Sequence, residues 1–176
     1  MGRVGERDWP VAEAVDTERL LLEPLRVDHA EELAPLLDDP ALHEYVGGSP
    51  ATPEQLRERY RRQTVGRSPD GREGWLNWVV RHRDSGDAVG TVQATVRLDG
   101  DRPVAELAWV VLTPHQGRGY AGEAAAGLVG WLAERDIRAL VAHVHPDHRA
   151  SARVAERLGL RATDERADGE VRWVAP

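Results

Sequence analysis

A glycine-rich turn joins an apolar run, residues 104–112, to an amphipathic one, residues 121–132, and reads Gln116-Gly117-Arg118-Gly119-Tyr120-Ala121. A helix leaves its first backbone N–H groups unpaired and carries partial positive charge at that end, so anions bind there. Gly117 and Gly119 let the backbone approach a bulky diphosphate without an intervening side chain. The sequence therefore predicts a phosphate-binding turn between a strand and a helix.

Two patterns for phosphate-containing cofactors fit this turn. Counted from Gln116 it matches the Q/R-x-x-G-x-G/A pattern of coenzyme A binding in N-acyltransferases, and counted from Gly117 it matches the G-x-G-x-x-G of dinucleotide folds. A dinucleotide fold needs a carboxylate at the tip of the next strand to hold the ribose. The next expected strand, residues 139–144, is followed by His145 and Pro146 instead. Coenzyme A is therefore the favoured ligand, and a dinucleotide oxidoreductase is the weaker alternative.

The composition describes an acidic chain of 176 residues without cysteine and with a net charge of −7. The absence of Cys excludes disulfides and thiolate metal sites, and the negative charge argues against nucleic acid as a partner. The longest nearly apolar run, residues 105–112, is too short to span a bilayer, and the polar start has no signal-peptide features. We expect a cytoplasmic protein without a membrane partner, with an N-terminal tail over residues 1–16 and one domain over residues 17–176.

Hydrophobic periodicity and turn residues predict a mixed α/β chain. Thr52 is expected to cap the second helix, with Pro53 in its first turn and Gln55 completing a capping box. A strand–helix–strand unit follows three antiparallel strands, and its two strands should be parallel. The expected strands are residues 19–25, 75–81, 88–97, 104–112, 139–144, 161–166 and 171–174. The expected helices are residues 28–37, a second from residue 52, 121–132 and 151–158.

This order of elements resembles that of the GNAT superfamily of acyl-CoA-dependent N-acyltransferases. The resemblance is carried by the glycine-rich turn and by Pro146-Asp147-His148-Arg149-Ala150-Ser151 ahead of Leu158-Gly159-Leu160. The opening Thr17-Glu18-Arg19-Leu20-Leu21-Leu22 is similar to that of the branch containing ribosomal-protein alanine N-acetyltransferases. Over about residues 17–174, the resemblance implies an α/β (α+β) fold. Its central sheet would be mixed and mostly antiparallel, with about six or seven strands, a splayed parallel pair and about four flanking helices.

The resemblance also implies that acetyl-CoA, as the acyl donor, lies where the strands 104–112 and 139–144 separate. Backbone at the end of the first of these strands would pair with the pantetheine arm, and the amides of the turn would hold the diphosphate. The segment around His148 and Ser151 corresponds to a second cofactor contact. The cofactor-binding residues expected in this way are Val110, Val111, Leu112, Gln116, Gly117, Arg118, Gly119, Tyr120, Ala121, His148 and Ser151.

The chain departs from the family pattern at several positions. His148 stands where an Asn is common, and it can still cap the following helix. Ala155 replaces the tyrosine that serves many members as general acid, so that acid is missing or is supplied elsewhere. Leu160 replaces a usual Phe, and His115 alone separates Pro114 from the turn where two residues are commoner. The last two changes cast little doubt on the fold.

Acetyl transfer to an amine requires a proton acceptor, because an alkyl amine with a pKa near ~10 is mostly protonated at pH 7. Glu106 is the candidate, since it is the one ionisable residue within an otherwise apolar strand beside the proposed cofactor. Burial is expected to raise its pKa toward neutrality. The alternative interpretation is a carboxylate paired with an arginine.

The departing thiolate needs only modest help, so a general acid is dispensable. Ser151 is the first candidate for one and Tyr120 a distant second, although Ser151 also fits the N-terminal cap of its helix. The spacing His143-x-His145-x-x-His148 suggests a metal site, but two strand-end residues and one loop residue do not fix an ion, and family members need none. We expect no metal.

The leading functional interpretation is an acetyl-CoA-dependent N-acetyltransferase acting on a primary amine, at a protein N-terminus or on a small molecule. The alternative is a non-catalytic acyl-CoA-binding sensor or interaction domain, which the missing tyrosine allows. The acceptor stays open, because neither the first two helices nor residues 65–74 carry a diagnostic motif. The related branch often forms homodimers, so a homodimer is an open expectation for this chain too.

Overall fold

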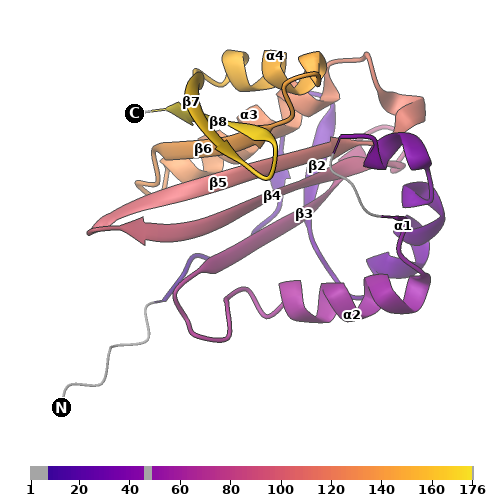
Figure 1. Ribbon diagram of the computed structural model, residues 1–176. Helices are drawn as coiled ribbons and strands as arrows, with labels where there is room; N and C mark the ends of the chain where they lie inside the picture. The colour runs from indigo at the N-terminus through magenta and orange to yellow at the C-terminus, as the bar shows by residue number, and fades with distance from the viewer. Residues whose placement is uncertain (1–7, 46–48, 176) are drawn as a thin grey trace.

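The computed structural model describes residues 8–45 and 49–175, which form one eight-stranded sheet with helices on both faces (Figure 1). The helices are α1 (His29–Leu37), α2 (Pro53–Gln63), α3 (Tyr120–Ala133) and α4 (Arg149–Arg157), with short 3-10 turns η1 (Pro40–His43) and η2 (Thr113–His115). The strands are β1 (Val15–Asp16), β2 (Leu20–Pro24), β3 (Gly74–His82), β4 (Ala88–Asp99), β5 (Arg102–Val111), β6 (Ala139–Val144), β7 (Arg161–Ala167) and β8 (Glu170–Ala175).

The sheet has the strand order β1-β2-β3-β4-β5-β6-β8-β7. Every neighbouring pair is antiparallel except β5 and β6, which are parallel and joined through α3. The expected mixed, mostly antiparallel sheet with one parallel pair and four helices is therefore confirmed. The eighth strand is the two-residue β1, which is too short to give a periodic signal in the sequence.

Part of the segment assigned to an N-terminal tail packs against the sheet. Val15 and Asp16 form β1 alongside β2. The indole of Trp78 donates a hydrogen bond to the carbonyl of Glu13 at 2.7 Å, and Trp9 donates to the carbonyl of Gly71 at 3.0 Å. The two tryptophan hydrogen bonds join residues more than 60 positions apart in the chain, which explains why local sequence patterns did not reveal them.

The two faces of the sheet are covered differently. Helices α3 and α4 pack on one face, where Trp78 of β3 meets Trp131 of α3 edge-on at 5.3 Å between ring centroids. Helices α1 and α2 cover the other face only near β2 and β3, through Leu33, Leu56 and Val79. This second face is left open over most of β4 and over β5, where its residues are partly or largely exposed, whereas on β6 Ala139 and Val141 are buried. We call it the open face.

Helix α2 begins as its sequence predicts. The Gln55 amide donates to the Thr52 hydroxyl at 3.2 Å, and the Thr52 amide donates to the Gln55 side chain at 2.9 Å. The predicted capping box is therefore confirmed, and it satisfies two backbone donors at the helix start. Glu23 of β2 joins α1 to the sheet, because it accepts hydrogen bonds from Arg26 and Arg81, and Arg81 also donates to Glu32 of α1 at 2.8 Å.

Candidate functional site

Strands β5 and β6 pair along only part of their length and then separate. Their registered pairs run from Val104 with Ala139 to Leu107 with Ala142. Beyond this point β5 continues to Val111, paired with β4 alone. The backbone of residues 108–111 therefore has N–H and C=O groups facing the gap toward β6 without a strand partner. This fork is the position at which the family resemblance implies the acyl donor.

The glycine-rich turn lies at the end of β5 and starts α3. Gly117 and Gly119 have φ values of +76° and +81°, which glycine adopts without steric cost. Gly119 is the N-cap of α3 and provides no side-chain hydrogen bond, so first-turn amides stay open for an anion. The side chain of Gln116 donates to the carbonyl of Val111 at 2.9 Å. Gln116 therefore holds the turn onto β5, which is a structural role.

The turn is also held by the segment between β1 and β2. Glu123, in the first turn of α3, accepts hydrogen bonds from the Thr17 hydroxyl and from the Arg19 amide and Nε, each at 2.7 Å. Arg19 in addition donates through Nη1 to the carbonyl oxygen of Arg118 at 2.9 Å. The Thr-Glu-Arg opening thus has a physical reason: it orients the carboxylate that fixes the start of α3.

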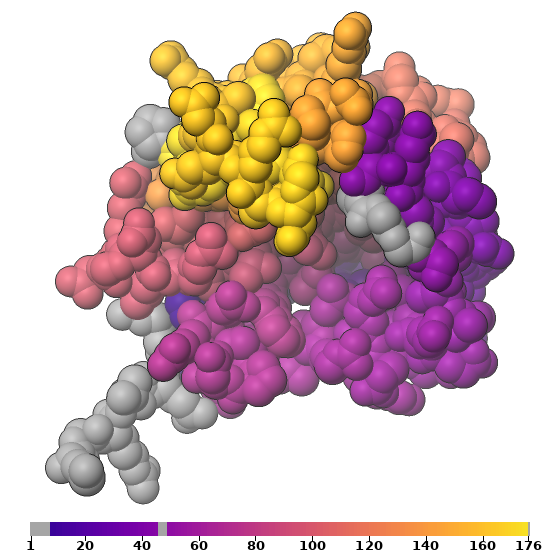
Figure 2. Space-filling model, viewed as in Figure 1, coloured from indigo at the N-terminus to yellow at the C-terminus, as the bar shows by residue number. Residues whose placement is uncertain are grey.

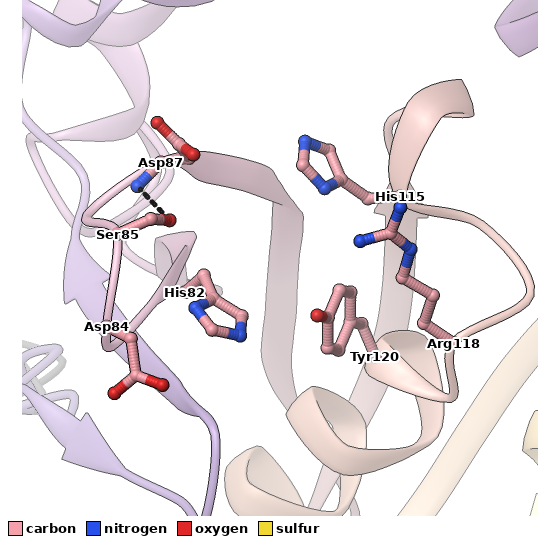
Figure 3. Close-up of a pocket in the computed structure, with 7 residues that line it drawn as sticks. All are labelled: His82, Asp84, Ser85, Asp87, His115, Arg118 and Tyr120. Carbon is pink, nitrogen blue, oxygen red and sulfur yellow. Dashed lines mark hydrogen bonds between the residues drawn. The ribbon is translucent and has the colours of Figure 1, made fainter.

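A hollow of about 290 Å³ lies beside the turn, between it and the β3–β4 connection (Figure 3). Its wall is formed by His82, Asp84, Ser85, Asp87, His115, Arg118 and Tyr120. It lies on the β4 side of β5, whereas the fork lies on the β6 side. Tyr120 lines this hollow and is 7% exposed. The guanidinium carbon of Arg19 lies over the Tyr120 ring, 4.8 Å from the ring centroid. The structure therefore removes Tyr120 from the candidates for a general acid at the fork.

Glu106 lies on the open face next to the fork and has two partners. Arg97 of β4 donates to Glu106 Oε2 at 2.9 Å, and His143 Nδ1 lies 2.9 Å from Glu106 Oε1. Burial alone raises the pKa of Glu106, but the hydrogen bonds and charges of Arg97 and His143 outweigh it, so the pKa falls below its ordinary value. The expectation that burial brings this pKa toward neutrality is wrong, and the arginine-paired alternative describes the carboxylate.

The contact between Glu106 and His143 defines the state of the imidazole. An ionised carboxylate can only accept hydrogen bonds, so the contacting Nδ1 carries the proton. In a neutral imidazole the other nitrogen, Nε2, is then an acceptor for a proton. His143 directly follows Ala142, the last residue of β6 that pairs with β5. The sequence noted His143 only in a metal pattern and missed this pairing.

Ser151 and His148 sit at the start of α4. His148 is the N-cap, with Nδ1 accepting from the Ser151 amide at 3.4 Å, so His148 and not Ser151 caps the helix. The Ser151 hydroxyl accepts instead from the indole N–H of Trp109, on β5, at 3.3 Å. Burial and the charge of His145 lower the pKa of His148. Tyr45, which follows η1, stacks on the His148 ring at 4.3 Å.

Glu170 is a further ionisable residue that sequence reasoning missed. It lies on β8 two residues from Arg172, which pairs with His143, so Glu170 and His143 point to the same face. Burial raises the pKa of Glu170, and the charges of His143 and His145 oppose this shift only in part. Among the described residues Glu170 has no hydrogen-bond or ion-pair partner. Its place in a terminal hairpin gave no signal, because strand alternation alone does not reveal such a neighbour.

The histidines at 143, 145 and 148 do not form a metal-binding cluster. Over residues 8–45 and 49–175, the structure contains no group of three or more His, Asp or Glu side chains arranged to hold an ion. Within the same part of the chain, no helix combines the length and the apolar character needed to cross a membrane.

The profile of the acetyltransferase (GNAT) domain matches residues 19–161. The chain belongs to the GNAT acetyltransferase family. This confirms the family expected from the glycine-rich turn and its flanking elements. Among curated proteins, this GNAT protein is 26% identical to the uncharacterized protein YkkB of Bacillus subtilis (strain 168) over 137 residues, or 76% of each chain.

Solved structures share the GNAT fold. An acetyltransferase from Agrobacterium tumefaciens str. C58 superimposes with a TM-score of 0.71 and 28% identity, over 99% of each chain. RimL, a ribosomal L7/L12 alpha-N-protein acetyltransferase in complex with coenzyme A, has a TM-score of 0.75 and 16% identity, over 93% of this chain and 97% of RimL. A GNAT-family acetyltransferase from Bacillus anthracis has a TM-score of 0.75 and 20% identity, over 93% and 98%.

Proposed function

We propose that this GNAT protein transfers an acetyl group from acetyl-CoA to a primary amine, at a protein N-terminus or on a small molecule. The observation that carries the proposal is the Glu106–His143 pair, placed where β5 and β6 separate. The proposed catalytic domain is residues 17–176. Family membership supports the acetyl donor, and the exposed backbone at the fork gives the donor a place to bind.

The residues of the fork and the turn fit an acyl-CoA molecule. The pantetheine arm carries amide groups, which can pair as a strand would with the backbone groups of β5 that point away from β4, at Trp109 and Val111. The Val110 carbonyl, by contrast, lies against Gly90 of β4. Its diphosphate fits the open amides from Arg118 to Ala121 at the start of α3. Because Gln116 occupies the carbonyl of Val111, that oxygen has one lone pair left for the arm. The Leu112 amide donates to Val89 and its carbonyl accepts from the His115 amide, so Leu112 offers the arm only the second lone pair of that carbonyl.

The amine then attacks the thioester carbon directly. His143 Nε2 accepts the proton that the amine gives up, while Glu106 holds the imidazole and stabilises the positive charge that forms on it. The new C–N bond replaces the C–S bond, and coenzyme A leaves as a thiolate. The Ser151 hydroxyl belongs to the second segment expected to contact the cofactor, and it is the candidate to return a proton to the sulfur. In this scheme His143 is the catalytic base, Glu106 is its positioning residue, and Ala155, which is fully buried, takes no part.

The test is release of free thiol from acetyl-CoA in the presence of a panel of amines. Release that depends on the amine supports the transferase. Binding of acetyl-CoA, seen as a rise in the melting temperature, without thiol release for any amine would favour the alternative of an acyl-CoA sensor. A ligand at ~100 times its dissociation constant stabilises the folded state by about 2.7 kcal/mol, which is readily measured.

A further inference from the structure

A hollow of about 180 Å³ lies on the open face between α2, β3 and β4. Figure 2 shows a recess on this side of the molecule, between the magenta atoms around α2 and the yellow atoms of the last hairpin. The residues lining the hollow are Arg59, Arg62, Gln63, Trp75, Asn77, Gln93, Ala94 and Thr95. Its volume is below the ~300–1,000 Å³ of a site for a complete small ligand. It is sized for one side chain of a larger molecule.

The hollow is a neighbour of the proposed reaction centre. Thr95 in its wall pairs directly with Glu106 on one side and with Trp75 on the other. Directly paired residues point to the same face, so the three side chains form a row across the sheet. Neighbouring strands lie ~4.8 Å apart, so the row spans roughly 10 Å. An extended peptide whose amino group meets the Glu106–His143 pair covers this distance with about three residues.

The hollow is positively charged, although the protein as a whole is acidic. Arg59 and Arg62 lie three residues apart and therefore on one face of α2. Arg62 has a distant partner in Glu58, at 3.6 Å, whereas Arg59 has no ion-pair partner within the described part of the chain. Within residues 8–45 and 49–175, no Asp or Glu lines the hollow. One guanidinium group is thus uncompensated at this position, and a second is compensated only weakly.

The remaining lining suits a peptide backbone. The side-chain amides of Asn77 and Gln93 make no hydrogen bond to any described residue, so both can donate and accept. The Trp75 indole donates to Glu73 at 3.1 Å, which fixes its ring as a wall of the hollow.

We propose that this hollow binds a carboxylate of the acceptor, and that the preferred acceptors are peptides with a free N-terminus and an acidic side chain within the first four residues. The inference rests on the proposed function, because it assumes that the amine reacts at the Glu106–His143 pair. The guanidinium groups of Arg59 and Arg62 bind the carboxylate through charge-assisted hydrogen bonds. Asn77 and Gln93 hold the peptide backbone between the two ends.

The test compares two peptides with amidated C-termini, Ser-Ala-Glu-Glu and Ser-Ala-Lys-Lys. Binding to the full-length protein is measured by calorimetry with coenzyme A present, and acetylation by thiol release from acetyl-CoA. We expect the acidic peptide to be preferred at least about tenfold, as a charge-assisted contact gives. Arg59→Glu combined with Arg62→Glu should remove or reverse the preference. Arg61→Glu is the matched control, because Arg61 is exposed on the same helix but does not line the hollow.

The outcomes separate this inference from the proposed function. Equal binding of the two peptides, or a preference that survives the double charge reversal, overturns the carboxylate site. Acetylation of both peptides at the same rate would overturn it too while leaving the transferase standing. Charge-dependent binding without acetyl transfer would support the site and contradict the proposed activity.

Discussion

Nδ1 of His143 lies 2.9 Å from Oε1 of Glu106, across the two strands that separate at the candidate site. The carboxylate is held in turn by Arg97, which keeps it ionised and fixes it as a hydrogen-bond acceptor. A carboxylate with a lowered pKa is a poor base by itself, but it orients a histidine well. In the mechanism that we propose, the base is therefore His143 and not Glu106, which the sequence favoured.

Glu106→Gln should lower kcat by about 100-fold or more, the usual contribution of a positioned base, while acetyl-CoA binding is unchanged. His143→Asn should have a similar effect, and the double variant should be little worse than either single one, because the two side chains act as a unit. Steady-state thiol release checks the activities. Arg97→Gln should give a smaller loss in the same direction, because Glu106 then keeps His143 but loses one of the two groups that lower its pKa. Independent, multiplying losses in the double variant would contradict the pairing.

Ser151→Ala should cost roughly 1 kcal/mol of stability, since the Trp109 indole loses its hydrogen-bond acceptor at a partly buried position. If Ser151 also returns the proton to the thiolate, kcat should fall, and the alkaline limb of the profile of kcat against pH should shift. Chemical denaturation and pH–rate profiles separate the two effects. An unchanged pH profile together with lower stability would leave Ser151 a structural role only.

Arg19→Ala should weaken acetyl-CoA binding, because the carbonyl of Arg118 and the carboxylate of Glu123 both lose a donor. We expect a loss of several-fold in affinity, measured by calorimetry. Arg83→Ala is a suitable control, since Arg83 donates to the carbonyl of Thr17 in the same segment but does not touch the turn. Equal affinities of the two variants would show that Arg19 does not shape the turn.

Glu23 should make stability depend on acid pH. The burial of Glu23 raises its pKa, but the hydrogen bonds from Arg81 and Arg26 outweigh this and lower it to about 2. A carboxyl with a folded-state pKa below its unfolded value contributes stability above pH ~4.5 and loses it as the pH falls toward ~2. With 22% of the side chain exposed, the contribution is at most about 3 kcal/mol.

Urea denaturation of Glu23→Gln should therefore show a stability deficit that is largest near neutral pH and shrinks between pH ~4.5 and ~2. Glu31→Gln is the control, because Glu31 pairs only with Arg57 and is 74% exposed. A deficit of constant size over this range would contradict the ionic origin.

Gly90→Ala should destabilise the fold strongly, because its Cβ would lie 2.1 Å from the carbonyl oxygen of Val110. Backbone on β5 would have to move, at the position where it borders the fork. Gly130→Ala is the matched control: it lies within α3 with no atom within 4 Å of the added Cβ, and helix propensity predicts a gain of up to ~1 kcal/mol. Thermal denaturation compares the two, and equal effects would refute the steric argument.

Local sequence patterns predicted most of the fold, because strands, caps and glycine turns depend on residues close together in the chain. The capping box of Thr52 and Gln55 is one such case, and the strand–helix–strand order around the glycine turn is another. The two-residue β1 escaped because it is too short to give a periodic signal, and the packing of Trp9 escaped because its partner Gly71 lies 62 residues away.

The candidate site was less accessible to sequence reasoning. Glu106 was found because a carboxylate in an apolar strand is unusual, but its partner is 37 residues away and nothing local connects them. The raised pKa of Glu170 depends on burial beneath neighbouring elements, which sequence alternation cannot supply. The sequence left both His148 and Ser151 as possible caps of α4, and in the structure the cap is His148.

The bond from Arg19 to Arg118 joins positions 99 residues apart in the chain. Arg19 is synthesised early and Arg118 much later, with four strands, β2 to β5, between them in the chain, so this hydrogen bond forms only when the two segments are brought together. Closing so long a loop carries an entropic cost that local contacts do not offset. We therefore expect the turn proposed to hold coenzyme A to take its final shape late in folding.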